Sequence, residues 1–305
     1  MSETIPHIPV LYNEVCEIFK NVSSGYIVDC TTGYGGHSEI ILKNNSNIKM
    51  ICNDQDNEAI EFSTKRLSSF SDRIIFSKSN FENVLQKFQD FEITGVLADI
   101  GVSSLQLDKN ERGFGFLSDT LDMRMDETQS LTAKNIVNEY SQNELERIFK
   151  DFGEVKEYKK AASIVIQNRP FESAKELAQI FEKNFKKTKI HPATLPFQAI
   201  RIEVNRELDV LSSIFDQLEE LKLSNCIVAI ISFHSLEDRI VKNYFKKWST
   251  NCICPNSAFK CECGNNNAIG EVLTKKPIEA SGFEIKQNPR SRSAKMRIFK
   301  FYDFN

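Results

Sequence analysis

The sequence lacks the features of a membrane-bound or exported protein. No apolar run approaches the roughly 18 consecutive residues that a membrane span needs, and the opening MSETIPHIPV has neither a basic n-region nor an apolar h-region. The 305 residues also contain no internal repeat and no low-complexity tract. With 41% hydrophobic and 27% charged residues, the composition is typical of a globular protein. We therefore expect a cytoplasmic protein that has no membrane partner.

An overall excess of positive charge is missing as well. Lys and Arg number 39 against 42 acidic residues, a net charge of −3, so the average does not indicate a nucleic-acid-binding protein. Locally, residues 286–300 carry six Lys or Arg and no acid, and two further basic clusters lie at 183–189 and 242–248. A charge run is usually a solvated face. Contact of these clusters with a polyanion therefore stays open.

Glycine is scarce, yet three of the 12 glycines fall within four positions. They are Gly33, Gly35 and Gly36, in the segment DCTTGYGGHS at 29–38. The preceding YIV is typical of a buried strand, and the segment after the glycines has the pattern of a helix. A strand that runs through a glycine turn into a helix is a place where backbone can approach a ligand.

Strand-like and helix-like segments alternate through the first hundred residues. This β-α-β-α-β-α-β order predicts a parallel sheet with helices on both faces. Residues 106–196 show only loops and helices; the strand pattern returns at 225 and is followed by two β-like segments, GFEIK (282–286) and AKMRIFKF (294–301). We expect a doubly wound, Rossmann-like α/β domain formed by residues 1–105 and 198–305, with an inserted helical domain at 106–197.

Two acids end predicted strands of this sheet. Asp54, which lies 21 residues after Gly33, is placed to bind ribose hydroxyls, although it could instead cap the next helix. Ser38 stands where a dinucleotide fingerprint has its last glycine, so S-adenosyl-L-methionine fits at least as well as NAD. Asp99 ends the fourth strand, a position where amino-group methyltransferases keep an acid or amide. A tight turn that binds no ligand is the alternative.

Half of the eight cysteines are bunched in the pattern C-I-C-x6-C-E-C. They are Cys252, Cys254, Cys261 and Cys263. Four thiolates this close could bind zinc, although the C-x-C pairs depart from the commoner C-x2-C. A reduced or cystine-like loop is the alternative, so the sequence alone assigns no metal ligand.

Longer motifs resemble those of the RsmH (MraW) family of 16S rRNA cytosine-N4 methyltransferases. The matching segments run nearly from end to end: HIPVLYNEV (7–15), GYGGHS (33–38), ADIGVSSLQLD (98–108), RGFGF (112–116), LDMRMD (121–126), HPATLPFQAIRIEVNREL (191–208), SFHSLEDRIVK (232–242) and NPRSRSAKMR (288–297). Departures are Tyr34 where the family usually has Arg, Leu105 where it has Pro, and Val155 where it has Glu. None of them removes a glycine or an acid from the residues expected to bind the cofactor.

The resemblance implies a class I methyltransferase fold and a reaction. A methyl group would pass from S-adenosyl-L-methionine to the exocyclic N4 of a decoding-centre cytidine in 16S rRNA, within the small ribosomal subunit, and the insertion would recognise the substrate. The methyl donor would be bound by Gly35, Gly36, His37, Asp54, Phe81, Asp99 and Gln106.

The amino nitrogen of cytosine is a poor nucleophile, so catalysis should consist mainly of positioning and of holding the amino protons. We expect Asp99 to accept those protons and His234 to contact the base; a structural histidine is the alternative for the latter. The base must be unstacked, and three rings that could stack on it, or belong to the core, are Phe114, Phe116 and Phe233. Candidate RNA contacts are Arg112, Asn205, Arg290, Arg292 and Lys295.

Other functions stay open at this point. One is a methyltransferase that acts on DNA or protein; another is a non-catalytic RNA-binding protein that retains the fold. An NAD-dependent oxidoreductase is disfavoured by Ser38. The sequence determines neither the oligomeric state nor whether free rRNA or an assembled subunit is the substrate.

Overall fold

The computed structural model describes residues 8–255 and 257–304, and the chain forms two compact units. One, the sheet unit, consists of the chain up to Gly101 and from Asp209 onward; the other, the helical unit, is Val102–Leu208. The second boundary lies beyond the 197/198 position expected from sequence. The reason is α10 (Thr194–Asn205), which continues across that position and packs against α6 (Ala133–Glu139) and α7 (Gln142–Asp151). His7, which opens the HIPVLYNEV motif, lies outside the described residues.

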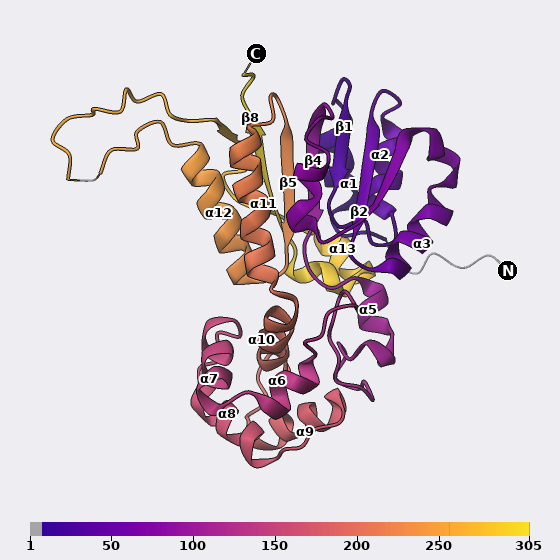
Figure 1. The fold of residues 1–305 in the computed structure, drawn as a ribbon, viewed down its shortest axis with the longest axis vertical. Helices are drawn as coiled ribbons and strands as arrows, with labels where there is room; N and C mark the ends of the chain where they lie inside the picture. The colour runs from indigo at the N-terminus through magenta and orange to yellow at the C-terminus, as the bar shows by residue number, and fades with distance from the viewer. Residues whose placement is uncertain (1–7, 256, 305) are drawn as a thin grey trace. The chain divides into compact units, whose positions relative to one another are not determined.

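A mixed sheet forms the centre of the sheet unit (Figure 1). Five parallel strands lie in the order β3-β2-β1-β4-β5, and β8 pairs antiparallel with β5, then β6 and β7 with β8. The strands are β1 (Tyr26–Asp29), β2 (Lys49–Asp54), β3 (Ile74–Lys78), β4 (Ile93–Asp99), β5 (Ile227–Ser232), β6 (Gly270–Val272), β7 (Ile278–Glu279) and β8 (Lys295–Phe301). The predicted doubly wound fold is confirmed. The order reverses between β1 and β4, and ligands bind at such a switch point.

Helices cover both faces of this sheet. Ile27 and Leu97 pack in a cluster with α1 and α2, whereas the neighbouring Val28 and Val96 pack in another cluster with α4, α11 and α12. Strands buried on both faces are continuously apolar because each alternate side chain meets a helix layer. The helices are α1 (Tyr12–Phe19), α2 (Gly36–Asn44), α3 (Asn57–Arg66), α4 (Val84–Lys87), α11 (Glu207–Leu221), α12 (Ser235–Trp248) and α13 (Gly282–Gln287), with 3-10 turns η1 (Ser68–Arg73), η2 (Phe81–Asn83) and η4 (Pro289–Ser293).

The prediction of a β segment at GFEIK is wrong, because these residues begin α13. The alternation of Phe283 and Ile285 suggested a strand, but Ser281 caps a helix by accepting a hydrogen bond from the Glu284 N–H at 3.1 Å. Ser-x-x-Glu is a helix-start signature, and local capping here prevails over a short alternation. AKMRIFKF, in contrast, is confirmed as β8, and β6 and β7 are additional strands.

The helical unit has its own core. Leu145, Ile148 and Phe149 show the helical spacing on α7, and all three are fully buried. Residues 102–208 are all described and contain no strand, as expected. Their further elements are α5 (Ser104–Asp108), η3 (Asn110–Arg112), α8 (Tyr158–Gln167) and α9 (Ala174–Asn184). Across the described residues, no helix combines the length and hydropathy that crossing a bilayer requires.

An aromatic cluster anchors the antiparallel side of the sheet. Trp248, the single tryptophan, is 2% exposed at the end of α12. Its ring centroid lies 5.3 Å from those of Phe299 and Phe301 on β8, and 5.6 Å from that of Phe215 on α11. Aromatic pairs at this range stabilise beyond the area they bury. The cluster joins α11 and α12 to β8.

Replacing Phe299 with Ala should destabilise the sheet unit by about 3–5 kcal/mol, because it empties a fully buried ring position. Denaturant unfolding followed by Trp248 fluorescence measures this, since the only tryptophan contacts the mutated ring. The control is Phe283→Ala at a 70% exposed ring, expected within about 0.5 kcal/mol of the parent. Equal effects of the two substitutions would contradict the packing described.

Candidate active site

The glycine turn after β1 depends on left-handed backbone at two positions. Gly33 has φ +50° and Gly35 has φ +75°, a region that L-residues rarely adopt. A Cβ on Gly35 would lie 3.1 Å from Leu67 Cδ1, and one on Gly36 would lie 2.2 Å from Pro9 Cγ. A Cβ on Gly33 would meet no atom of residues 8–255 or 257–304 within 4 Å, so these residues leave that side of the turn open. The turn ends at α2, whose first N–H groups receive no side-chain cap from any described residue and are suited to an anion.

Asp54 joins the end of β2 to this turn. Its Oδ2 accepts a hydrogen bond from the Gly33 N–H at 2.8 Å, and its Oδ1 accepts one from the Asp56 N–H at 2.9 Å. The Gln55 N–H also donates to this carboxylate, so about one of its four lone-pair sites remains for a ligand hydroxyl. Burial raises the pKa of Asp54 to about 6. The helix-cap alternative is excluded, because Asp56 caps α3 by accepting from the Glu58 N–H at 3.0 Å.

Asp99 ends β4 with an unsatisfied carboxyl oxygen. Its N–H donates to Thr31 Oγ1 at 2.7 Å, whereas its Oδ1 is buried and has no hydrogen-bond partner among the described residues. The pKa of Asp99 is raised to about 8, first by burial and then by the negative charges of Asp29 and Glu237. Buried polar atoms without partners are rare in folded proteins. This oxygen therefore marks a position for a donor group of a ligand.

His37, in the first turn of α2, faces Asp99. Its Nε2 donates to the Val10 carbonyl at 2.8 Å, and its Nδ1 lies 3.8 Å from Asp99 Oδ2. Burial lowers the pKa of His37 to about 4, so the ring is neutral near pH 7 with its proton on Nε2. The Nδ1 lone pair thus faces the Asp99 carboxyl. This arrangement favours the protonated, neutral form of Asp99 as long as no cationic ligand is bound.

Two polar residues that sequence reasoning did not assign also shape this edge. Asp29 accepts from Ser38 Oγ at 2.6 Å, and burial raises its pKa to about 7. Asn53 is fully buried and donates to the carbonyls of Cys30 at 3.1 Å and Ser79 at 2.9 Å. Asn53 therefore connects the ends of β1, β2 and β3. The sequence signal that could have identified Asn53 is its position as a polar residue within the apolar run of β2.

Two aromatic rings lie close to these strand ends. Phe81, the first residue of η2, is 9% exposed and packs in the cluster with α4, α11 and α12. Phe233 follows β5 and is half-buried; a Cβ on Gly101, two residues beyond Asp99, would lie 3.3 Å from its Cδ2. Phe233 thus belongs to the same part of the sheet unit as Asp99.

His234 is the N-cap of α12. Its Nδ1 accepts from the Glu237 N–H at 3.5 Å, and Glu237 Oε2 accepts from the N–H groups of Phe233 at 2.8 Å and His234 at 3.2 Å. His234 Nε2 lies 3.0 Å from Glu237 Oε1, but the two are not aligned, and both lack a hydrogen-bond partner among the described residues. His234 therefore has a structural role as a helix cap through Nδ1, and its Nε2 has no hydrogen-bond partner among the described residues.

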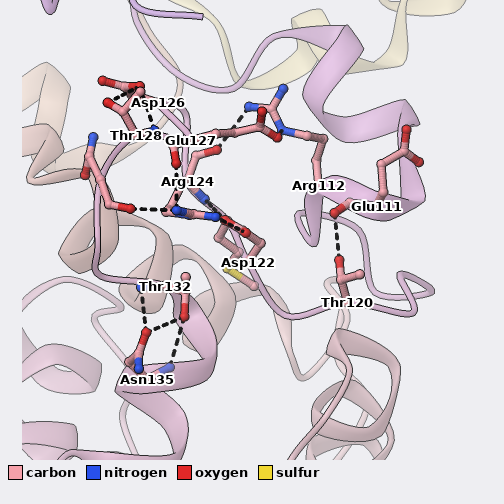
Figure 2. A network of polar contacts seen from close by, with 12 residues as sticks. Glu111, Arg112, Thr120, Asp122, Arg124, Asp126, Glu127, Thr128, Thr132 and Asn135 are labelled. Atoms are coloured by element: carbon pink, nitrogen blue, oxygen red, sulfur yellow. Dashed lines mark hydrogen bonds and ion pairs between the residues drawn. The ribbon is translucent and has the colours of Figure 1, made fainter.

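The helical unit contains Arg112, which holds the LDMRMD segment (Figure 2). Its guanidinium donates to the carbonyls of Arg124 and Met125, each at 3.1 Å, and lies 3.5 Å from Glu127 Oε1. Arg124 in turn forms a bidentate pair with Asp122, with N–O distances of 2.8 and 2.7 Å. A Cβ on Gly113 would lie 2.4 Å from the Asp122 nitrogen. RGFGF and LDMRMD are therefore packed together through backbone.

Asn205, at the end of α10, binds the same segment. Its Oδ1 accepts from the Met125 N–H at 2.8 Å, and its Nδ2 donates to the Met123 carbonyl at 2.8 Å. Asn205 and Arg112 are each only 5% exposed. Direct RNA contact by either residue stays a prediction, and this burial does not favour it; in the structure both hold residues 123–125.

The other predicted residues of the helical unit are also packed. Gln106 on α5 is 4% exposed, and its Oε1 accepts from the Ser103 N–H at 3.1 Å. Phe114 is 7% exposed in the core of this unit, and Phe116 stacks on His191 with ring centroids 4.7 Å apart. Phe114 thus has the core role that was its alternative.

The predicted RNA contacts near the C-terminus differ from these. Arg290 and Arg292 are exposed on η4, and Lys295 is half-buried at the start of β8. Their charged groups belong to the sheet unit and come from the segment that carries six basic residues and no acid. The structure leaves the two arginines accessible to a polyanion.

Comparison with known proteins extends this picture. Residues 4–302 match the model of the MraW methylase family. The ribosomal RNA small subunit methyltransferase H of Aliarcobacter butzleri is 68% identical over 297 residues, 97% of this chain and 99% of that protein. The protein of the same name from Sulfurimonas denitrificans is 55% identical over 303 residues, 98% of this chain and 99% of that protein. With a match of this extent, and a switch-point site built from Gly33, Asp54 and Asp99, the chain belongs to the MraW methylase family.

Proposed function

We propose that this chain methylates small-subunit ribosomal RNA, at the exocyclic N4 of a decoding-centre cytidine in 16S rRNA. The observation that carries the proposal is the buried Asp99 Oδ1, which has no hydrogen-bond partner among the described residues, at the end of β4. The relatives named as small-subunit rRNA methyltransferases support the substrate.

The methyl donor is S-adenosyl-L-methionine, which supplies, when bound, a methyl group activated by a positively charged sulfur. The residues present fit its groups. The remaining lone-pair site of Asp54 suits a ribose hydroxyl. The Gly35 N–H donates to the Thr32 carbonyl at 2.7 Å, so it is the N–H groups from Gly36 onward, at the start of α2, that suit a carboxylate. Phe81 and Gln106 are further donor contacts that the family resemblance implies.

Asp99 would act on the amino group that becomes methylated. That nitrogen is a weak nucleophile because its lone pair is delocalised into the ring, and methylation requires loss of one amino proton. With a pKa of about 8, Asp99 is protonated near neutral pH when no ligand is bound. The positive charge of a bound donor would favour its ionised form, which is suited to accept a hydrogen bond and then a proton. Asp99 would thus orient the nitrogen and receive its proton.

The rest of the substrate would be held by an aromatic platform and by cations. Phe233 is our candidate for stacking on the unstacked base, because it lies over Gly101 close to Asp99. His234 Nε2, which lacks a hydrogen-bond partner among the described residues, is the candidate for a polar contact to the base. Exposed Arg290 and Arg292 would contact phosphates.

Methyl transfer to small ribosomal subunits that lack the modification tests this function. Radiolabelled donor is supplied, and the labelled nucleoside is identified after digestion. We expect label in N4-methylcytidine from subunits. Label in another nucleoside, or only in DNA or protein offered in parallel, would overturn the substrate while retaining the donor site.

Asp54→Asn should weaken donor binding roughly 10- to 150-fold, the loss of a charge-assisted hydrogen bond worth about 1.5–3 kcal/mol. Titration calorimetry with S-adenosyl-L-methionine measures the affinity. Asp72→Asn removes the same charge at an exposed position of the sheet unit and should bind as the parent does. Thermal unfolding without donor shows whether the Gly33 turn survives; a folded Asp54→Asn with parental affinity would refute the ribose role.

Donor affinity should rise with pH. Burial raises the pKa of Asp54 to about 6 and that of Asp99 to about 8, so both are protonated below these values and ionised above them. A cationic ligand favours the ionised forms, by up to about tenfold per pH unit below the pKa of a group it deprotonates.

The comparison of parent with Asp99→Asn between pH 5.5 and 8.5 isolates Asp99. The donor's own amino group titrates at about 7.7–8.0 in both proteins and cancels. In the plot of donor affinity against pH, the variant should lack the rise between pH 6 and 8 that ionisation of Asp99 contributes. Identical slopes in the two proteins would show that Asp99 does not ionise when donor binds.

A further inference from the structure

The loop between α12 and β6 is long and has little packing of its own. It runs from residue 249 to 269, and its described residues form neither helix nor strand (Figure 1). Ile253 and Phe259 on it are exposed, at 64% and 109%. Its base is closed by backbone hydrogen bonds from Asn267 to Asn251 at 3.1 Å and from Ile269 to Trp248 at 2.8 Å. A loop of this length usually has a function or another source of order.

Four cysteine sulfurs meet within this loop. The Sγ atoms of Cys252, Cys254, Cys261 and Cys263 all lie within 4.8 Å of one another. The distances are 3.7 Å for Cys252–Cys261, 3.6 Å for Cys261–Cys263 and 3.8 Å for Cys263–Cys252. A tetrahedron of thiolates about 2.3 Å from a zinc ion has edges of about 3.8 Å. A disulfide bond, in contrast, is about 2.05 Å long.

The backbone around the sulfurs is arranged in a reciprocal way. The two C-x-C pairs are Cys252 with Cys254 and Cys261 with Cys263. The Ile253 N–H, between the first two, donates to Cys263 Sγ, and the Glu262 N–H, between the other two, donates to Cys254 Sγ, both at 3.3 Å. Hydrogen bonds of this kind stabilise the charged form of a thiol. Such donors around a metal also orient its ligands.

We propose that Cys252, Cys254, Cys261 and Cys263 bind one zinc ion in a structural site. Four thiolates fill a tetrahedron and leave no open position for catalysis, and this donor set selects zinc among common divalent ions. The ion joins the two C-x-C arms of the loop, and its binding displaces the protons of the thiols. The site lies outside the strand-end residues assigned to methyl transfer and does not depend on them.

Metal analysis of the full chain tests the site. The protein, purified without chelator and dialysed, should contain one zinc per chain. The double variant Cys261→Ser, Cys263→Ser should lose at least nine-tenths of that zinc, while Cys16→Ser, a cysteine on α1, should keep it all. Absence of zinc from the parent, with no uptake by the reduced protein, would overturn the site. One iron per chain instead would overturn the assignment of the ion.

Two measurements on the parent protein do not depend on how the variants fold. Trypsin should cleave after the exposed Lys260 at least tenfold faster once a chelator has removed the metal; equal rates would contradict a structural ion. Under denaturing, non-reducing conditions with chelator, all eight cysteines should react as free thiols. A count of four would reveal two disulfides in their place.

Discussion

The hydrogen bond from the Gly33 N–H to the Asp54 carboxylate, at 2.8 Å, is the contact on which the site depends. It joins the turn after β1 to the end of β2, so the glycine turn and the Asp54 carboxylate are held next to each other at the strand ends. Asn53 adds the end of β3 through Ser79. Glycine at Gly33 and Gly35 adopts the φ values of +50° and +75° that this turn requires without the strain that a side chain would add.

The same strand ends carry an electrostatic cost. Burial raises the pKa values of Asp29, Asp54 and Asp99 to about 7, 6 and 8, all above their unfolded values. Stability from a carboxyl of this kind is complete at low pH and is lost as pH rises through the folded pKa. A ligand that brings positive charge offsets that cost. Raised carboxyl pKa values at a switch point are expected where a cation binds. His37 is neutral, so it does not supply the positive charge that would lower them.

The helical unit shows a different use of charge. Arg112 and Asn205 are buried, and their hydrogen-bonding groups bind the backbone of residues 123–125. Met123 has φ +61° within this segment, and strained backbone persists where its surroundings over-determine it. The motif RGFGF and the region around Asn205 thus both hold the motif LDMRMD in its conformation. Charge and polarity in these motifs stabilise a loop conformation.

The sequence by itself determined the alternating pattern of the sheet, the glycine turn and the acids at strand ends. These features are local: they depend on periodicity and on residue types a few positions apart. The caps formed by Asp56 on α3 and by Ser281 on α13 are local as well, and the sequence already carried their signals. Only the tertiary structure decided that the Asp54 carboxylate accepts from the Gly33 N–H and that Arg112 is buried. It also brought the four cysteine sulfurs within 4.8 Å. The physical reason is that burial and pairing across distant segments set the roles of polar side chains, and neither can be read from neighbours along the chain.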